Sequence, residues 1–335
     1  MDDFGVIVVC CAMDVHLARG CCASIRHFLG RTPICLLVDG YVDVGDIVAT
    51  YGVEVIRNVD LAERRLRDVC CGWGYTKMAA HWVSPWPTFL LLDADTAIWG
   101  NVRQHADFER FDFIVDRHMT ELFPGHMSRS IAPLFGKEAV LKSQLRRLHV
   151  KKWYFDVVGM NEAIPGIDWE NSIDALFCSA VSFARRGSLD LERFYDLLDR
   201  GEAAPDLFAA GEMGIYNALV VESPLRVDRR AGLHQFVQMD TRDNLMRRFP
   251  VDAADGPLVV GDAIVIHWAG ETRPTLDGRL AYSDPMTFFR RKFYRDRGIN
   301  DESRLDAILR REDLMYRDLR PIAAFGSNEH ASQRV

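Results

Sequence analysis

The chain has 335 residues, of which 48% are hydrophobic and 27% are charged, as in an ordinary globular protein. Its formal net charge of −7 argues against a nucleic-acid-binding surface as the main function. Six of the eight cysteines stand in adjacent pairs and no CxxC pair occurs, so we expect free thiols in the cytoplasm rather than disulfides or a zinc site. The acidic N-terminus lacks the basic start of a signal peptide, and no window is long and apolar enough to cross a bilayer.

The first hundred residues alternate between strand and helix patterns. The run FGVIVVC is typical of a buried parallel strand, because its β-branched and apolar residues are continuous. The expected elements are strands over 4–10, 33–40, 53–58 and 88–93, and helices over 14–29, 44–51 and 75–83. This alternation predicts an α/β fold with a mostly parallel sheet. Ligands of such sheets bind beyond the carboxyl ends of the strands, where Asp14, Asp39, Asp93 and Asp95 stand.

The second half of the chain is less regular. Residues 117–175 show no clean period and match no motif. The remaining expected elements are strands over 112–116 and 176–185, helices over 189–201 and 211–223, a strand–turn–strand over 257–270 and a helical tail over 283–317. Gly201 is expected to cap the first of these helices, and His267 to end the last strand. No repeat or linker is found, which favours a single domain.

Two carboxylates follow the most apolar strand, in the stretch TFLLLDADTAIWG. Asp93 and Asp95 stand at i and i+2, so in an extended chain both side chains point to one side. Paired oxygen ligands of this kind suit Mg²⁺ or Mn²⁺. The motif by itself fits a solvated strand end, the D-x-D-x-T nucleophile strand of haloacid-dehalogenase-like phosphatases, or the metal-binding D-x-D of GT-A glycosyltransferases.

A second motif, HWAGETRP, separates these alternatives. With His267, Gly270, Arg273 and Pro274 it resembles the H-x-x-G-x-x-K-P signature of glycosyltransferase family 8, with Arg in place of Lys. The phosphatase family usually carries its motif on the first strand, whereas here the D-x-D follows the fourth expected strand. The phosphatases also need a later acidic motif, and Gly261-Asp262 is followed by no second acid. The chain therefore resembles the glycogenin-like and galactosyltransferase-like retaining enzymes of family 8.

This resemblance implies a GT-A-type nucleotide-binding fold, with a mostly parallel mixed sheet flanked by helices, and a metal site. Asp93, Asp95 and His267 would hold Mn²⁺ or Mg²⁺, and Gly270 and Arg273 would bind the diphosphate of a nucleotide sugar. The implied activity is sugar transfer from a nucleotide-diphosphate sugar, expected to be a UDP-sugar, to a hydroxyl acceptor such as a glycan, a glycolipid or a small molecule, with retention. A non-catalytic nucleotide-sugar-binding protein of the same fold and a phosphatase with Asp93 as nucleophile remain alternatives.

Further residues take roles from the resemblance. Val9, Cys10, Asp14 and Ala94 would contact the nucleotide; a cap of the following helix is the competing role for Asp14. Lys77 would contact phosphate and, with Arg273, stabilise the leaving group. In GEMGIYN, which resembles the family's D-Q-x-x-x-N segment, Met213 replaces the Gln, and Glu212 becomes the nearest catalytic carboxylate. In LFCSAVSF, which resembles the family's F-N-x-G-V strand, Cys178 and Ala180 depart from the pattern.

The resemblance also sets the expected domain limits. We expect a catalytic domain over 1–282, with a nucleotide-binding half at 1–116 and an acceptor and donor-sugar half at 117–282. A helical C-terminal extension and tail would follow at 283–335. Residues 288–298 (FFRRKFYRDRG) interleave aromatic and basic side chains, a pattern of either a helix packed on the core or a peripheral contact with the inner face of the membrane. No nucleic-acid partner is expected.

Overall fold

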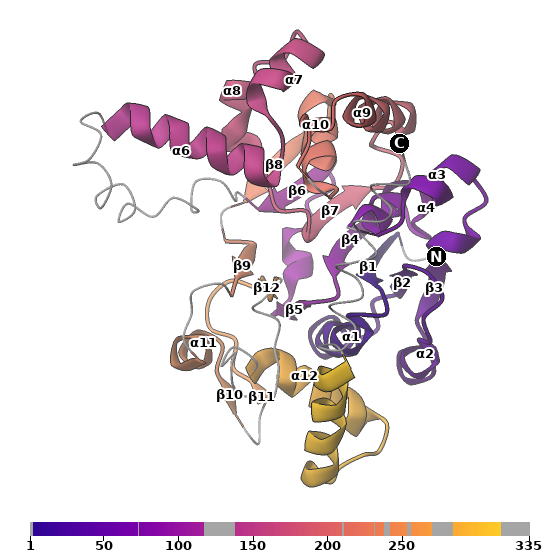
Figure 1. Ribbon diagram of the computed structural model, residues 1–335. Coiled ribbons are helices and arrows are strands. Elements are labelled where there is room, and N and C mark those ends of the chain that lie inside the picture. The colour runs from indigo at the N-terminus through magenta and orange to yellow at the C-terminus, as the bar shows by residue number, and fades with distance from the viewer. Residues whose placement is uncertain are drawn as a thin grey trace. The chain divides into compact units, whose positions relative to one another are not determined.

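The computed structural model describes residues 3–315, except for 73, 117–137, 210, 231, 238–241, 253–255 and 270–283 (Figure 1). These residues group into two compact units, each discontinuous in sequence. Unit 1 contains Glu63–Leu91 and Ala106–Leu233, and unit 2 contains Asp2–Ala62, Leu92–His105 and His234–Val335. The domain limits expected from the sequence stay a prediction.

The main sheet is mixed and mostly parallel, as predicted. Its strand order is β3-β2-β1-β4-β7-β6-β8, and β4 (Thr88–Asp93) begins in unit 1 and ends in unit 2. The strands β1 (Phe4–Cys10), β2 (Ile34–Val38) and β3 (Glu54–Arg57) pair in parallel. In contrast, β6 (Phe113–Asp116) pairs with β7 (Val181–Arg185) antiparallel and with β8 (Val227–Arg230) parallel. The almost complete burial of β1, β2 and β4 explains their continuous apolar sequences.

Unit 2 also contains a three-stranded sheet with the order β5-β12-β9. These strands are β5 (Thr96–Trp99), β12 (Ile264–His267) and β9 (His234–Phe236). The helix α1 (Val15–Leu29) contacts both β5 and α12 (Asp284–Asp296), and Figure 1 shows α1 and α12 side by side. The remaining elements of this unit are α2 (Gly45–Tyr51), η1 (Asn58–Asp60), η3 (Val102–His105), α11 (Arg242–Arg248), β10 (Val251–Asp252) and β11 (Gly256–Pro257), and residues 302–315 are helical.

The basic and aromatic side chains of α12 have partners within unit 2. Phe289 and Phe293 are completely buried. Arg290 is also buried and pairs with Asp313 and Glu312 at 2.9 and 2.8 Å. Further along the helix, Arg291 pairs with Asp306, Lys292 with Asp296, and Arg295 with Glu302. Packing and ion pairing therefore account for the pattern of residues 288–298 without a membrane. No helix among the described residues is both long and apolar enough to span a bilayer.

Unit 1 packs its helices around an aromatic core. The rings of Phe113, Phe177 and Tyr216 meet edge to face, with centroids 5.2 to 5.9 Å apart. The Nε2 atom of His81 lies 2.7 Å from the hydroxyl oxygen of Tyr216, which is itself 3.0 Å from Oγ of Ser182. The helices of this unit are α3 (Arg64–Val69), η2 (Tyr75–Ala79), α4 (Ala80–Val83), α6 (Glu138–Trp153), α7 (Val157–Ala163), α8 (Trp169–Ser172), η4 (Ile173–Ala175), α9 (Leu191–Ala203) and α10 (Met213–Glu222).

Two sequence predictions in this unit are wrong at their limits. The strand predicted over 176–185 begins only at Val181, because the side chain of Asn217 bonds the N–H and C=O of Phe177 in place of a neighbouring strand. The helix predicted to end before Gly201 continues to Ala203, so Gly201 lies inside it. The structure joins none of the eight cysteines, all of which are described, in a disulfide.

Candidate metal and nucleotide site

The carboxylates of the D-x-D motif flank the tight turn between β4 and β5. The N–H of Ala94 donates to the carbonyl of Val9 at the end of β1, over 3.0 Å. The hydroxyl of Thr96 donates to the carbonyl of Asp93 over 2.7 Å. The second bond closes the turn, and the first ties it to the carboxyl end of β1, the edge at which ligands bind in open α/β sheets. The first bond also brings together Val9 and Ala94, two of the residues predicted to contact the nucleotide.

The register of β12 brings His267 to the same turn. β12 runs antiparallel to β5, with His267 opposite Thr96. The next residue, Trp268, donates its N–H to the carbonyl of Asp95 over 2.9 Å. As a result, Nε2 of His267 lies 3.3 Å from Oδ1 of Asp95. The structure thus makes Asp95 and His267 neighbours over a long separation in the chain, and their role as metal ligands stays a prediction.

These three side chains form a donor set that fits a divalent cation. One ligand atom from each of Asp93, Asp95 and His267 lies within 4.8 Å of the other two. Neighbouring ligands of an octahedral cation with bonds of about 2.1 Å stand about 3 Å apart, close to the separation of His267 and Asp95. Two oxygens and one imidazole nitrogen suit Mn²⁺. Asp95 and His267 are buried, whereas Asp93 is half-buried and leaves the set accessible.

Two aromatic side chains that sequence reasoning missed surround His267. β9 pairs in parallel with β12, which places Phe236 opposite His267 and His234 two residues before Phe236. The Nε2 atom of His234 lies 3.0 Å from Nδ1 of His267. The ring centroid of Phe236 lies 4.9 Å from that of His267. The three-residue strand β9 is too short to give a clear pattern, so its pairing could not be read from the sequence.

The predicted nucleotide residues at the end of β1 are held by backbone bonds. The carbonyl of Cys10 accepts from the N–H of Asp39, and the Cys10 side chain is buried. Burial, with the nearby Asp14 carboxylate as a smaller cause, raises the pKa of the Cys10 thiol. Asp14 precedes α1, but its carboxylate does not cap the helix and instead accepts from the N–H of Cys11 over 2.7 Å. The side chain of Asp14 therefore helps to fix the turn that follows β1.

Lys77 and Glu212 form a buried ion pair in unit 1. The Nζ atom of Lys77 lies 3.0 Å from Oε1 of Glu212, and the exposed fractions of the two side chains are 5% and 9%. Ser179, in the segment that resembles the family's donor-sugar strand, donates its hydroxyl to the same carboxylate oxygen over 2.5 Å. Lys77 also donates to Oγ of Ser179 over 3.3 Å. Two residues predicted separately as catalytic are thus direct partners.

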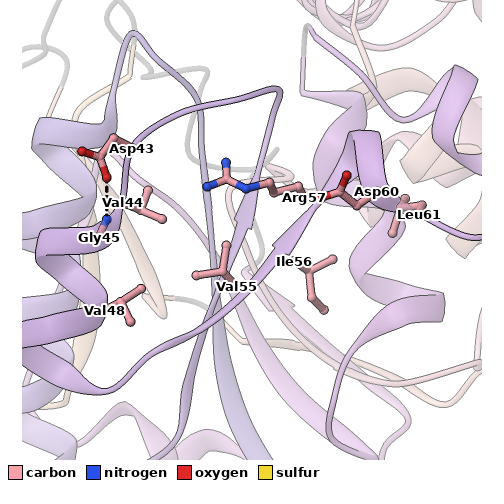
Figure 2. A pocket seen from close by; sticks show the side chains of 9 residues that line it. All are labelled: Asp43, Val44, Gly45, Val48, Val55, Ile56, Arg57, Asp60 and Leu61. Atoms are coloured by element: carbon pink, nitrogen blue, oxygen red, sulfur yellow. Dashed lines mark hydrogen bonds between the residues drawn. The ribbon is translucent and has the colours of Figure 1, made fainter.

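Gly270 and Arg273, predicted to bind the diphosphate, lie outside the described residues. A cavity of 540 Å³ opens elsewhere in unit 2, beside α2 and β3 (Figure 2). Valine and isoleucine side chains make much of its wall, and Arg57 is held at its edge by the carbonyls of Gly40 and Val42. None of the predicted site residues lines this cavity.

Comparison with known proteins supports the fold and leaves the family unassigned. No family model matches the chain, and no curated protein matches it. The structure is similar to galactosyltransferase LgtC in complex with donor and acceptor sugar analogues, with a TM-score of 0.50 and 13% identity over 89% of this chain and 98% of that one. It is also similar to an active-site mutant of LgtC, with a TM-score of 0.50 and 12% identity over 90% of this chain and 99% of that one.

The bifunctional glycosyltransferase WbbM is a third similar structure. Its TM-score is 0.51 and its identity 12%, over 88% of this chain and 52% of that one. The chain thus spans about half the length of WbbM and nearly all of LgtC. At these identities the comparisons establish a fold matching that of GT-A glycosyltransferases.

Proposed function

We propose that the protein is a metal-dependent glycosyltransferase that moves a sugar from a nucleotide-diphosphate sugar, expected to be a UDP-sugar, to a hydroxyl acceptor. The observation that carries this proposal is that one ligand atom from each of Asp93, Asp95 and His267 lies within 4.8 Å of the other two, at the carboxyl end of β4, a central strand of a GT-A-like sheet. Retention of configuration is proposed from the resemblance to family 8. A glycan, a glycolipid or a small molecule would serve as acceptor.

In this proposal Asp93, Asp95 and His267 hold a Mn²⁺ or Mg²⁺ ion. When bound, the ion supplies positive charge that stabilises the departing nucleoside diphosphate. Val9, Cys10, Asp14 and Ala94 would contact the nucleoside, and the bonds Ala94–Val9 and Cys11–Asp14 support this role by fixing the backbone there. Gly270 and Arg273 are proposed to bind the diphosphate, because Gly allows close backbone approach and Arg binds phosphate with two N–H groups.

Lys77 and Glu212 are proposed as catalytic residues on the resemblance of their segments to family motifs. The ion pair adds a constraint to that assignment. Glu212 is held by Lys77 and Ser179, so its carboxylate is fixed in orientation and its charge is balanced. A fixed carboxylate can stabilise positive charge that develops on the sugar ring. The positive charge of Lys77 offsets part of the negative charge of Glu212 and so limits this stabilisation. Stereochemical analysis of the product distinguishes a nucleophile from a base at this position.

The test is donor hydrolysis in the absence of acceptor. Purified protein is incubated with a panel of nucleotide sugars with Mn²⁺ or with EDTA, and release of the nucleoside diphosphate is measured. We expect metal-dependent release that falls at least ~100-fold in Asp95→Asn, since one charged ligand is lost. Asp60→Asn, which changes an exposed carboxylate far from the motif in sequence, is the matched control.

Two other outcomes would replace the proposal. Hydrolysis of p-nitrophenyl phosphate with Mg²⁺, abolished by Asp93→Asn, would establish the phosphatase alternative. Tight binding of a nucleotide sugar with no turnover under any metal would establish a non-catalytic binding protein. The GT-A-like fold favours neither of them.

A further inference from the structure

His234 lies in direct contact with the proposed metal ligand His267. Its side chain is buried, and its Nε2 atom is 3.0 Å from Nδ1 of His267, within hydrogen-bond distance. The two rings stack, with centroids 5.0 Å apart and planes 29° from parallel. Phe236 packs against both rings, with its centroid 4.4 Å from that of His234 and 4.9 Å from that of His267. The ring of His267 is therefore fixed by packing as well as by the hydrogen bond.

The contact with His234 bears on which nitrogen of His267 can bind a metal. Nε2 of His267 faces the Asp95 carboxylate, whereas Nδ1 faces His234. A neutral imidazole that binds a metal through Nε2 must carry its proton on Nδ1, and that buried N–H needs an acceptor. Nε2 of His234 is an acceptor within reach of that N–H.

We propose that His234 is a positioning residue that fixes the orientation and the metal-binding tautomer of His267. This inference rests on the proposed function and adds to it a residue outside both sequence motifs. In the metal-bound state, Nδ1–H of His267 donates to Nε2 of His234, which leaves the Nε2 lone pair of His267 directed at the metal.

A neutral partner suits this site electrostatically. Metal-bound histidines commonly donate to a carboxylate, a backbone carbonyl or water. Here Asp93 and Asp95 already balance the charge of a divalent cation. A third buried carboxylate would add an uncompensated negative charge, whereas an imidazole accepts the hydrogen bond without one. The ring of Phe236, tilted against both imidazoles, adds apolar contact that holds the pair in place.

Three variants of the full chain separate the effect of the His234–His267 hydrogen bond on metal binding from the effect of ring packing. His234→Phe keeps an aromatic ring but removes the acceptor. His234→Gln keeps an acceptor near the place of Nε2, and His234→Asn carries its acceptor too close to the backbone. Manganese affinity is measured from the electron paramagnetic resonance signal of free Mn²⁺ during titration. We expect the Kd of His234→Phe and His234→Asn to rise 10- to 100-fold, as for other partners of metal ligands, and that of His234→Gln to stay within about threefold.

A spectroscopic measurement tests the mechanism itself. Imidazole ¹H–¹⁵N correlation spectra of the Mg²⁺-loaded protein should show the His267 proton on Nδ1, with the signal identified by its loss in His267→Ala. Electron spin-echo spectra of the Mn²⁺-loaded protein should show one coordinated imidazole. Two coordinated imidazoles, or a His234→Phe protein that binds Mn²⁺ as tightly as the wild type, would overturn the inference.

The controls distinguish the inference from the function on which it rests. If Asp95→Asn and His267→Ala weaken Mn²⁺ binding and His234→Phe does not, only the positioning role fails. If Asp95→Asn and His267→Ala bind Mn²⁺ like the wild type, the metal site of the proposed function fails. Circular dichroism and thermal unfolding of the metal-free proteins establish that each variant is folded, and a His234→Gln protein that is folded but as weak as His234→Phe counts against the hydrogen bond.

Discussion

The ammonium group of Lys77 lies 3.0 Å from the carboxylate of Glu212, and both side chains are almost fully buried. Removal of two charges from water is costly, and only their mutual attraction and further hydrogen bonds offset the cost. Ser179 supplies such a bond to Glu212. The loss of either partner therefore affects both stability and the orientation of the other.

Replacement of Lys77 alone should destabilise the fold strongly. In Lys77→Met the Glu212 carboxylate is left buried without its counter-charge, and we expect the free energy of unfolding to fall by about 3–5 kcal/mol. The double variant Lys77→Met with Glu212→Gln removes both charges and should recover much of that loss. Urea denaturation of the two variants and of the wild type measures the difference. Equal stability of the single and double variants would show that the unpaired Glu212 carboxylate is not the cause of the loss.

A methyl group at Gly74 should displace the Glu212 carboxylate. Gly74 has φ +84°, and a Cβ there would overlap both carboxylate oxygens of Glu212. We expect Gly74→Ala to lower turnover at least tenfold and to leave Mn²⁺ affinity unchanged. The control is Gly187→Ala: at φ +73° it carries similar backbone strain, but its Cβ would meet open space. Initial rates of nucleoside diphosphate release compare the two, and equal rates would argue against a catalytic role for Glu212.

His81 should make the protein sensitive to acid. Its complete burial lowers the pKa of the imidazole from the ordinary 6.5 to about 3. Between these values the unfolded chain binds a proton that the folded chain does not, so the free energy of unfolding falls as pH falls below 6.5. The slope from this one group approaches about 1.4 kcal/mol per pH unit.

The variant His81→Gln keeps a polar partner for Tyr216 but does not titrate. The free energy of unfolding of each protein is measured from pH 7 to pH 4 and compared with its own value at pH 7. It should fall less steeply in His81→Gln than in the wild type, and the difference in slope should correspond to about one proton. Above pH 7 the two dependences should run in parallel, because His81 is neutral in both states. The same slope in both proteins below pH 6.5 would contradict the assignment.

Metal binding should stabilise the protein through His267. Manganese at 100 times its Kd is expected to raise the free energy of unfolding by about 2.7 kcal/mol, because it binds the folded state. His267→Ala should abolish this gain, and His149→Gln, on α6, should keep it. Denaturation with Mn²⁺ and with EDTA tests both. A full gain in His267→Ala would exclude this histidine from the site.

The sequence predicted the three candidate metal ligands because two motifs carry their chemistry locally. The apolar strand before Asp93 and the turn at Ala94 predicted a carboxylate pair beyond a strand end. The segment after Ile264 predicted a strand that ends on His267, and β12 ends there. Since both motifs lie at strand ends, short-range pattern was enough to place them, and their joint resemblance to family 8 suggested that they meet.

Elements that depend on distant partners were not predicted. The strand β9 has three residues, and its place beside β12 depends on pairing rather than on its own pattern. In the first half of the predicted strand 176–185, the N–H and C=O of Phe177 bond to the Asn217 side chain instead of to a neighbouring strand. Residues 138–175 contain the helices α6, α7, α8 and η4, whose sequences lack a clear period, and the caps at Asp156 and Asp168 that begin α7 and α8 were not recognised.

The sequence alone therefore predicted the α/β alternation, cysteines without disulfides, the D-x-D carboxylates Asp93 and Asp95, and His267 at the end of a later strand. Tertiary structure decided which side chains became partners: Lys77 with Glu212, and His234 with His267. The physical reason is that strand register and burial set these contacts. Register brings residues far apart in the chain within a few ångströms, and burial forces each charge or N–H to find the partner that lies there.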